Sequence, residues 1–272
     1  MRFSYLAAAG AVMMVAALLL ERERAARAEA ERLSRAKDDF LATVSHDLRA
    51  PLTVILGWVE VLRRTEPSRD ALDRALGPIE RNTRLQARLI DDLLDVARIV
   101  EGTLELQRTR IDLSSLLRHI VESHQPSARW KEISLGGMTP PDALYVYADS
   151  QRIEQMVGNV ISNAIKFTPA GGTACVTLDR EGDHATIAVR DDGPGIAPDL
   201  LPHVFEKFRQ GEEARAYGGL GLGLAIVKHL VLLHGGTVRA ASEGTNRGAT
   251  FVIELPLAED SAPAALARGS TR

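Results

Sequence analysis

The sequence has little cysteine, few aromatic residues and almost no excess of one charge. Cys175 is the single cysteine among 272 residues, which excludes an intramolecular disulfide framework and suits a reducing compartment. Because it lies in a strand-like run, we expect a small buried side chain rather than a reactive thiol. Aromatic residues make up 4% and the formal net charge is −3. The chain therefore offers neither a base-stacking surface nor a general attraction to nucleic acid, and we expect no nucleic-acid partner.

One long apolar run stands near the start of the sequence. Phe3 to Leu20 carries no charge, and a helix of that length rises about 27 Å, just enough to cross the hydrocarbon core of a bilayer. The alternative is a cleaved signal peptide. Its apolar region would be unusually long, and the small-x-small pattern Ala26 to Ala28 lies beyond a charged run. A single transmembrane anchor is the favoured interpretation.

Basic residues follow this run and hardly precede it. Six Arg and Lys residues lie between positions 22 and 37, against Arg2 alone before the run. This bias predicts a single-pass anchor in the inner (cytoplasmic) membrane, with everything after residue 20 in the cytoplasm. We expect no extracellular sensing domain before the anchor, because too few residues precede it in this sequence. Residues 21–38 indicate a helical linker. Ala26, Leu33 and Phe40 recur every seven residues, which suggests a parallel coiled-coil seam between two chains.

Two amphipathic helices are predicted after the linker. The first continues to about Leu62, and the second runs to about Val100, with Gly102 just past its end as a stop. The second helix is apolar over so much of its girth that it needs more than one neighbour. Two such hairpins from two chains would form a four-helix bundle. At the Gly-Pro pair ending in Pro78 we expect a kink, unless the helix begins there.

After residue 103 the periodicity changes to short strands mixed with helices. Strands that are grouped beside helices, and do not alternate strictly with them, indicate an α+β layer. Residues from Ala258 onward are small and polar, and we expect them to be disordered. The expected elements are strand-like alternation at 103–111, a helix at 113–123 capped by Asp112 or Ser114, a strand at 145–147, a helix from 150, strands at 173–178 and 185–190, a helix at about 222–233, and strands at 237–241 and 250–255.

His46 and Asp47 lie beside the apolar stripe of the first helix. Such a pair is often an ordinary solvated contact. A neutral imidazole nitrogen can also attack a phosphoryl group, while a neighbouring carboxylate orients the ring and takes the proton from the other nitrogen. The residues around the pair leave both interpretations open, and the second half of the chain decides between them.

Three constellations in the second half point to a nucleotide. Asn159 and Asn163 stand four residues apart and share one helix face, and amide oxygens suit Mg²⁺, which also binds nucleotide phosphates. The segment DDGPG at 191–195 follows a strand, and a carboxylate at this tight turn can accept a hydrogen bond from an amino group such as that of adenine. The run GGLGLG at 218–223 opens a helix whose N-terminus could cradle phosphate. The polar segment 211–217 before it could close as a lid.

In this order and spacing, the motifs resemble those of the sensor histidine kinases of two-component signalling. SHDLRAPL resembles the family's H box, NVISNAIKFTP its N box, DDGPGIAP and GLGLGLAIVK its glycine boxes, and HVFEKF its phenylalanine box. The resemblance covers about residues 35–256. It implies a helical hairpin that dimerises and carries the phosphorylated histidine, followed by a two-layer α+β sandwich of the Bergerat type that binds ATP.

The resemblance implies the organisation of the chain and a role for each matching residue. The chain would consist of an anchor at 1–20, a linker at 21–38, a dimerisation and histidine phosphotransfer domain at 39–102, an ATP-binding domain at 103–257 and a disordered tail at 258–272. His46 would be the phosphoacceptor, Asp47 its acid/base neighbour and Asn163 the Mg²⁺ ligand. Asn159 would support the phosphates, Lys166 would pair with phosphate, Phe167 would flank the adenine, Asp191 would bind its amino group, and Gly193, Gly195, Gly219, Gly221 and Gly223 would shape the pocket and lid.

The sequence assigns no direct ligand contact to two phenylalanines and the remaining histidines. Phe205 and Phe208 are expected to pack under the lid. The remaining histidines show no metal-ligand spacing; they are His119, His124, His184, His203, His229 and His234.

Two other functions are compatible with parts of the sequence. ATPases of the same nucleotide-binding superfamily resemble this chain in the N-box helix but carry a glutamate base where this chain has Asn159. Without a carboxylate there to activate water, phosphoryl transfer to a side chain is favoured. The other rival is a catalytically silent, membrane-tethered dimerisation scaffold. The intact His46, Asn163, Asp191 and glycine loops count against it.

A phosphohistidine implies a receiver. No receiver-like domain follows residue 256, so the phosphoryl group is expected to pass to an aspartate of a separate response regulator, with the kinase acting as a homodimer. In many relatives a Thr or Asn four residues after the histidine supports dephosphorylation of that regulator. Ala50 occupies this position and cannot orient a water molecule, so we expect weak phosphatase activity.

Overall fold

The computed structural model describes residues 22–23, 44–64, 69–140, 142–209 and 220–258. The chain divides into two compact units, residues 1–86 and 87–272. The predicted membrane anchor, the coiled-coil seam, the lid segment, Gly219 and the predicted disordered tail beyond residue 258 lie outside the described residues. Among the helices within the described ranges, none is both long and apolar enough to cross a bilayer.

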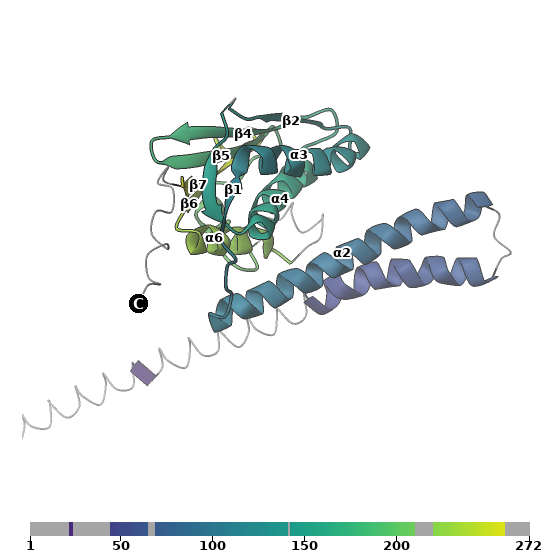
Figure 1. Cartoon of the computed structure of the whole chain (residues 1–272). Coiled ribbons are helices and arrows are strands. Elements are labelled where there is room, and N and C mark those ends of the chain that lie inside the picture. Colours follow the sequence, from purple (N-terminus) through teal and green to yellow (C-terminus); the bar gives the residue numbers. More distant parts are fainter. Residues whose placement is uncertain (1–21, 24–43, 65–68, 141, 210–219, 259–272) are drawn as a thin grey trace, which may run out of the picture. The chain divides into compact units, whose positions relative to one another are not determined.

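The first unit contains a helical hairpin, as the apolar periodicity predicts. A helix over residues 44–64 lies beside the first half of α2 (Arg69–Glu101) (Figure 1). Val44 and Ala75 are buried. Many larger apolar side chains of the hairpin are exposed on this single chain: Leu52, Val54, Leu56, Val59, Val61, Leu72, Leu76 and Leu85.

Helix α2 runs through Pro78 without interruption, so the helix does not begin at the Gly-Pro pair. Proline removes one backbone N–H from the helix, and nearby the side-chain amide of Asn82 donates to the carbonyl of Pro78 at 2.8 Å. The end of α2 is as predicted. Gly102 has φ +67°, and the N–H of Thr103 donates to the carbonyl of Arg98 at 2.9 Å, which is a left-handed helix stop.

Within its described residues, the second unit contains two sheets and three long helices besides the end of α2. The five-stranded sheet has the order β2-β4-β5-β7-β6, in which β2 and β4 are parallel and the other neighbours are antiparallel, while β1 and β3 form a separate antiparallel pair. The elements are β1 (Thr109–Asp112), α3 (Leu113–Trp130), β2 (Ser134–Met138), β3 (Tyr145–Ala148), α4 (Ser150–Phe167), β4 (Thr173–Glu181), β5 (His184–Asp191), the short 3-10 helix Leu201–His203, α6 (Gly223–Leu233), β6 (Thr237–Ala241) and β7 (Ala249–Pro256).

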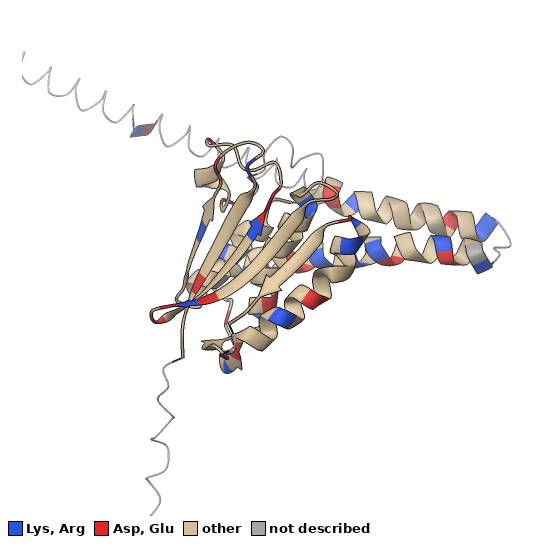
Figure 2. Cartoon of the chain, turned by 90° about the horizontal axis from the view of Figure 1, so that it is seen from above, with Lys and Arg blue, Asp and Glu red and all other residues tan. Residues whose placement is uncertain are grey.

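The helices α3, α4 and α6 cover one face of the large sheet (Figure 1). The strands are largely uncharged along their length, whereas charges of both signs are interspersed along the helices (Figure 2). Fully buried apolar side chains fill the space between the two layers, among them Ile153, Met156 and Ile161 of α4 and Leu178, Ile187 and Ile253 of the strands. The predicted α+β layer is therefore confirmed as a two-layer sandwich.

Three elements differ from the sequence predictions. Strand-like alternation was expected from residue 103, but only Thr109–Asp112 forms a strand. The helix expected to end near residue 123 continues to Trp130 through Pro126. Strand β2 was not predicted, because its sequence SLGGM contains two glycines and no β-branched residue. Asp112 caps α3 as expected, since its carboxylate accepts from the N–H of Ser115 at 3.1 Å.

Candidate functional site

His46 and Asp47 form a contact on the helix over residues 44–64. Nδ1 of His46 lies 3.1 Å from Oδ1 of Asp47. The histidine side chain is 82% exposed, whereas that of the aspartate is 14% exposed. Oδ2 of Asp47 is buried without a hydrogen-bond partner among the described residues. The carboxylate therefore engages one ring nitrogen and leaves Nε2 on an exposed side chain. Ala50, one helical turn on, is exposed as well.

Helix α4 positions four of the predicted site residues. Its apolar face is buried against the sheet and α6, which leaves Asn159 and Asn163 half-buried one turn apart. Near the end of the helix, Nζ of Lys166 lies 5.2 Å from the centre of the Phe167 ring. Lys131, from the turn after α3, donates to the carbonyls of residues 165 and 166 at 2.9 and 2.5 Å. This contact satisfies the last carbonyls of α4, and burial lowers the pKa of Lys131.

Asp191 ends strand β5 in a buried position. It is 8% exposed, and its Oδ1 accepts from the N–H groups of Gly193 at 3.0 Å and Ala249 at 3.3 Å. Burial raises the pKa of the carboxyl, and the two backbone N–H donors oppose that rise. The carboxylate is thus fixed in orientation, with its second oxygen available to a donor such as an exocyclic amino group.

The turn after Asp191 requires its glycines. A Cβ on Gly193 would lie 2.9 Å from Oδ1 of Asp191 and 3.3 Å from the backbone of Phe167, so the turn packs directly on the end of α4. Gly195 has φ +74°, and a Cβ there would lie 2.1 Å from the carbonyl oxygen of Gly244. No other residue type fits this conformation and this approach without displacement.

The second glycine segment leads into α6. Gly221 has φ +64°, and its carbonyl accepts from the N–H of Phe208 at 3.1 Å. Gly223 opens the helix, and its carbonyl accepts from Nδ2 of Asn159 at 3.4 Å. The start of α6 therefore lies against the asparagine face of α4. Phe205 packs edge-to-face on Phe251 with ring centres 6.3 Å apart.

The structure brings predicted nucleotide residues together in two groups. Asp191, Gly193 and Phe167 are in contact, and Asn159 touches Gly223. Phe208 is 41% exposed, and the lid under which it is expected to pack lies outside the described residues.

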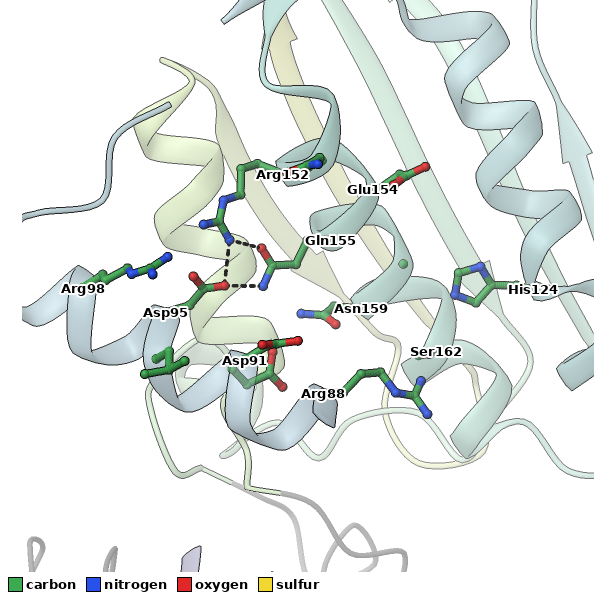
Figure 3. A pocket seen from close by; sticks show the side chains of 14 residues that line it. Arg88, Asp91, Asp95, Arg98, His124, Arg152, Glu154, Gln155, Asn159 and Ser162 are labelled. Atoms are coloured by element: carbon green, nitrogen blue, oxygen red, sulfur yellow. Dashed lines mark hydrogen bonds and ion pairs between the residues drawn. The ribbon is translucent and has the colours of Figure 1, made fainter. Parts of the chain in front are cut away.

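A polar cavity of about 480 Å³ lies beside Asn159 and Ser162 (Figure 3). Its walls are the last turns of α2, the outer face of α4 and the ring of His124 from α3. The motifs do not predict this cavity, because only Asn159 and Ser162 among its lining residues belong to a motif, the N box. A run of acids on α2 at 91, 92 and 95 was the only available signal, and such runs are usually solvated faces.

An ion pair joins α2 to α4 across this cavity. NH1 of Arg152 lies 2.7 Å from Oδ2 of Asp95, and Gln155 contacts both partners, donating to Asp95 at 2.6 Å and accepting from Arg152 at 2.7 Å (Figure 3). Asp92, one turn earlier on α2, is half-buried. Burial, together with the charge of Asp95, raises its pKa from 3.8 to about 6.

Two family models match the chain. The model described as "His Kinase A (phospho-acceptor) domain" matches residues 36–102. The model described as "Histidine kinase-, DNA gyrase B-, and HSP90-like ATPase" matches residues 148–259. The first contains His46 and both helices of the hairpin, and the second contains α4, the Asp191 turn and α6.

Two curated proteins are similar over most of the chain. The hybrid signal transduction histidine kinase D of Dictyostelium discoideum is 36% identical over 83% of this chain. The sensor histidine kinase TmoS of Ectopseudomonas mendocina is 39% identical over 83% of this chain. The chain spans only 15% and 23% of the length of these two proteins.

Two solved structures of histidine kinases are similar to this chain. Full-length ShkA in complex with AMPPNP is 33% identical, with a TM-score of 0.61 over 82% of this chain and 46% of that one. The histidine kinase ThkA in complex with the response regulator protein TrrA is 27% identical, with a TM-score of 0.57 over 83% of this chain and 63% of that one.

Proposed function

This chain belongs to the sensor histidine kinases of two-component signalling, and we propose that it is an ATP-dependent protein-histidine kinase. It phosphorylates itself on His46 and passes the phosphoryl group to an aspartate of a separate response regulator. The observation that carries this proposal is the presence, in one chain, of an exposed histidine held by a carboxylate and of a fixed, buried carboxylate at a glycine turn.

The His46–Asp47 contact supports the role of His46 as nucleophile. With the proton of Nδ1 directed at the carboxylate, the lone pair of Nε2 attacks the γ-phosphorus of ATP. The new N–P bond forms as the P–O bond to ADP breaks, and ADP carries away the electron pair. As the ring gains positive charge, Asp47 stabilises it and takes the Nδ1 proton.

The second unit supplies the nucleotide site in this proposal. Asp191 accepts a hydrogen bond from the adenine amino group, and Phe167, which the Gly193 turn contacts, flanks the adenine. Asn159 and Lys166 are the phosphate-side residues of α4. Gly221 takes the left-handed conformation in the turn before α6, and the N-terminus of this helix would bind phosphate.

Mg²⁺ fits the residues of α4. The amide of Asn163 is half-buried and offers the hard oxygen that Mg²⁺ prefers, and the nucleotide phosphates and water provide its other ligands. In that role Mg²⁺ would neutralise charge on the transferring phosphoryl group.

Asn159 stands where the related ATPases carry a glutamate base. Its amide donates to the carbonyl of Gly223 and cannot activate water, so hydrolysis is disfavoured. The intact His46, Asn163 and Asp191 disfavour a silent scaffold.

The partners and location complete the proposal. A homodimer would bury the exposed apolar row of the hairpin in a four-helix bundle. A response regulator is the natural acceptor, in line with the ThkA complex. Phe3 to Leu20 would anchor the chain in the inner membrane, with the remainder in the cytoplasm. The division at residues 20, 38, 102 and 257 is part of the same proposal.

Incubation of the purified chain with [γ-³²P]ATP and Mg²⁺ tests the proposed activity. We expect label that is lost in acid and stable in base, absent from His46→Gln and strongly reduced in Asp191→Asn. His119→Gln, on α3, is the matched control and should label like the wild type. Full labelling of His46→Gln would refute the assignment of the phosphoacceptor.

A further inference from the structure

A buried hydrogen-bonded pair joins the start of α4 to the end of α6. Asp149 caps α4, and its Oδ1 accepts from the N–H groups of Gln151 and Arg152 at 3.1 and 3.2 Å. The backbone N–H of Asp149 donates to Nε2 of His234 at 3.1 Å. The two residues are 9% and 5% exposed. Nδ1 of His234 lies 2.7 Å from the carbonyl of Leu230. With one nitrogen donating and the other accepting, the ring is a neutral imidazole with its proton on Nδ1.

A second hydrogen bond joins the same two helices at the start of α6. There Nδ2 of Asn159 donates to the carbonyl of Gly223. The step from Asp149 to Asn159 is about 15 Å of helix, and that from Gly223 to His234 is about 16 Å at the same rise per residue. The spacing between the two hydrogen bonds is thus nearly the same along α4 and along α6, and the two helices pack against each other. Together the two bonds fix the register of α6 along α4.

The segment that follows α2 is attached at the same place. The backbone N–H of Gln107 donates to Oδ2 of Asp149 at 3.0 Å, and the guanidinium of Arg108 donates to the carbonyl of Leu233 in the last turn of α6. Both oxygens of the Asp149 carboxylate are thereby engaged. Residues 107–108, the start of α4 and the end of α6 therefore contact one another at Asp149 and His234.

We propose that the Asp149–His234 hydrogen bond is a positioning contact for nucleotide binding, which holds the glycine turn at the start of α6 against Asn159. The proposal rests on the proposed function, because it assumes that this turn contacts ATP. Loss of the histidine acceptor would leave the N–H of Asp149 buried without a partner. Such a group finds a new partner only if water enters or the end of α6 moves, and a rigid helix that moves at one end carries the turn at its other end.

Binding of AMPPNP with Mg²⁺ to the full chain tests this contact without phosphoryl transfer. His234→Leu removes the acceptor at similar size, whereas His234→Gln keeps an oxygen acceptor within reach of the Asp149 N–H. His229→Leu is the matched control, since it lies on the same helix and no hydrogen bond of its side chain is found among the described residues. We expect His234→Leu to weaken binding about tenfold, and the other two variants to stay within about twofold of the wild type.

The outcomes separate the two proposals. If wild-type chain fails to bind AMPPNP, the proposed function fails. If the wild type binds and His234→Leu binds equally well, the positioning contact is wrong and the proposed function stands. Equal losses in His234→Leu and His234→Gln would also overturn it, because the effect would then not follow the acceptor.

The pH dependence of AMPPNP affinity provides a second measurement that needs no unstable variant. Protonated His234 cannot accept a hydrogen bond, and burial holds its pKa below the ordinary value of 6.5. Two charged groups face the His234 ring. Arg108, in the segment between α2 and β1, opposes its protonation, and Asp149, at the start of α4, favours its protonation. Below that pKa, wild-type affinity should fall more steeply than that of His234→Gln. Parallel profiles would refute the role of the ring nitrogen.

Discussion

Replacement of Asp92 by Asn should stabilise the fold, and the gain should depend on pH. The side chain of Asp92 is half-buried in the cavity between α2 and α4. Burial and the neighbouring Asp95 raise its pKa from 3.8 to about 6, and Arg88 opposes that rise. At about 1.36 kcal/mol per pKa unit, the ionised form costs the folded state up to about 3 kcal/mol, and solvent access reduces this to about 1–2 kcal/mol.

The sign follows from proton linkage. Between pH 3.8 and about 6 the folded chain binds more protons at Asp92 than the unfolded chain does, so stability falls as pH rises through this window. The full cost is present above about pH 6 and nearly absent below pH 3.8. Asp92→Asn should therefore gain about 1–2 kcal/mol at about pH 8 and about a third of that at about pH 4.5.

Urea unfolding of the full chain at these two pH values measures the difference. The matched control is Asp91→Asn, an exposed carboxylate on the same turn of α2, which should change stability by less than about 0.5 kcal/mol at either pH. An equal gain at both pH values, or a loss at about pH 8, would refute the desolvation of Asp92 against α4.

Three further predictions follow from the geometry. Gly195→Ala should destabilise the fold by more than about 3 kcal/mol in urea unfolding, since its Cβ would meet the carbonyl of Gly244. Gly182→Ala, at φ +64° with open space around it, should cost only about 1 kcal/mol. Arg152→Gln should destabilise the fold by about 2–4 kcal/mol, because it leaves the buried carboxylate of Asp95 without its ion-pair partner. Adding Asp95→Asn should restore much of that loss. A double variant less stable than Arg152→Gln alone would contradict this prediction. The purified chain should remove phosphate from its phosphorylated regulator slowly, and Ala50→Thr should accelerate the removal, as followed by gel assay; rapid removal by the wild type would contradict the prediction.

The parts of the site that could be predicted are those formed by residues close together in the sequence. The DDGPG turn combines a strand end, a carboxylate and obligatory glycines within five residues. Its contact with Phe167 follows because the chain returns through β4 and β5 to the end of α4. The Asn159 and Asn163 spacing fixes a helix face from sequence alone. The start of α6 against Asn159 is a packing result that the glycine run only suggests.

Long-range polar contacts could not be predicted. Arg152 and Asp95 are 57 residues apart, and neither belongs to a motif. The sequence around His234 shows no metal-ligand pattern, and its burial as a neutral hydrogen-bonding group depends on where α6 ends against α4. Strand β2 forms because pairing with β4 outweighs the poor strand propensity of its glycines.

In the proposed reaction, His46 receives the phosphoryl group of ATP. Trypsin should release residues 38–49, which contain His46 and no other histidine. After incubation with ATP and Mg²⁺ and digestion at mildly basic pH, mass spectrometry should find one phosphoryl group on this peptide, with fragment ions that place it on His46. A phosphoryl group on another residue, or an unmodified peptide from a chain that demonstrably binds ATP, would contradict the account.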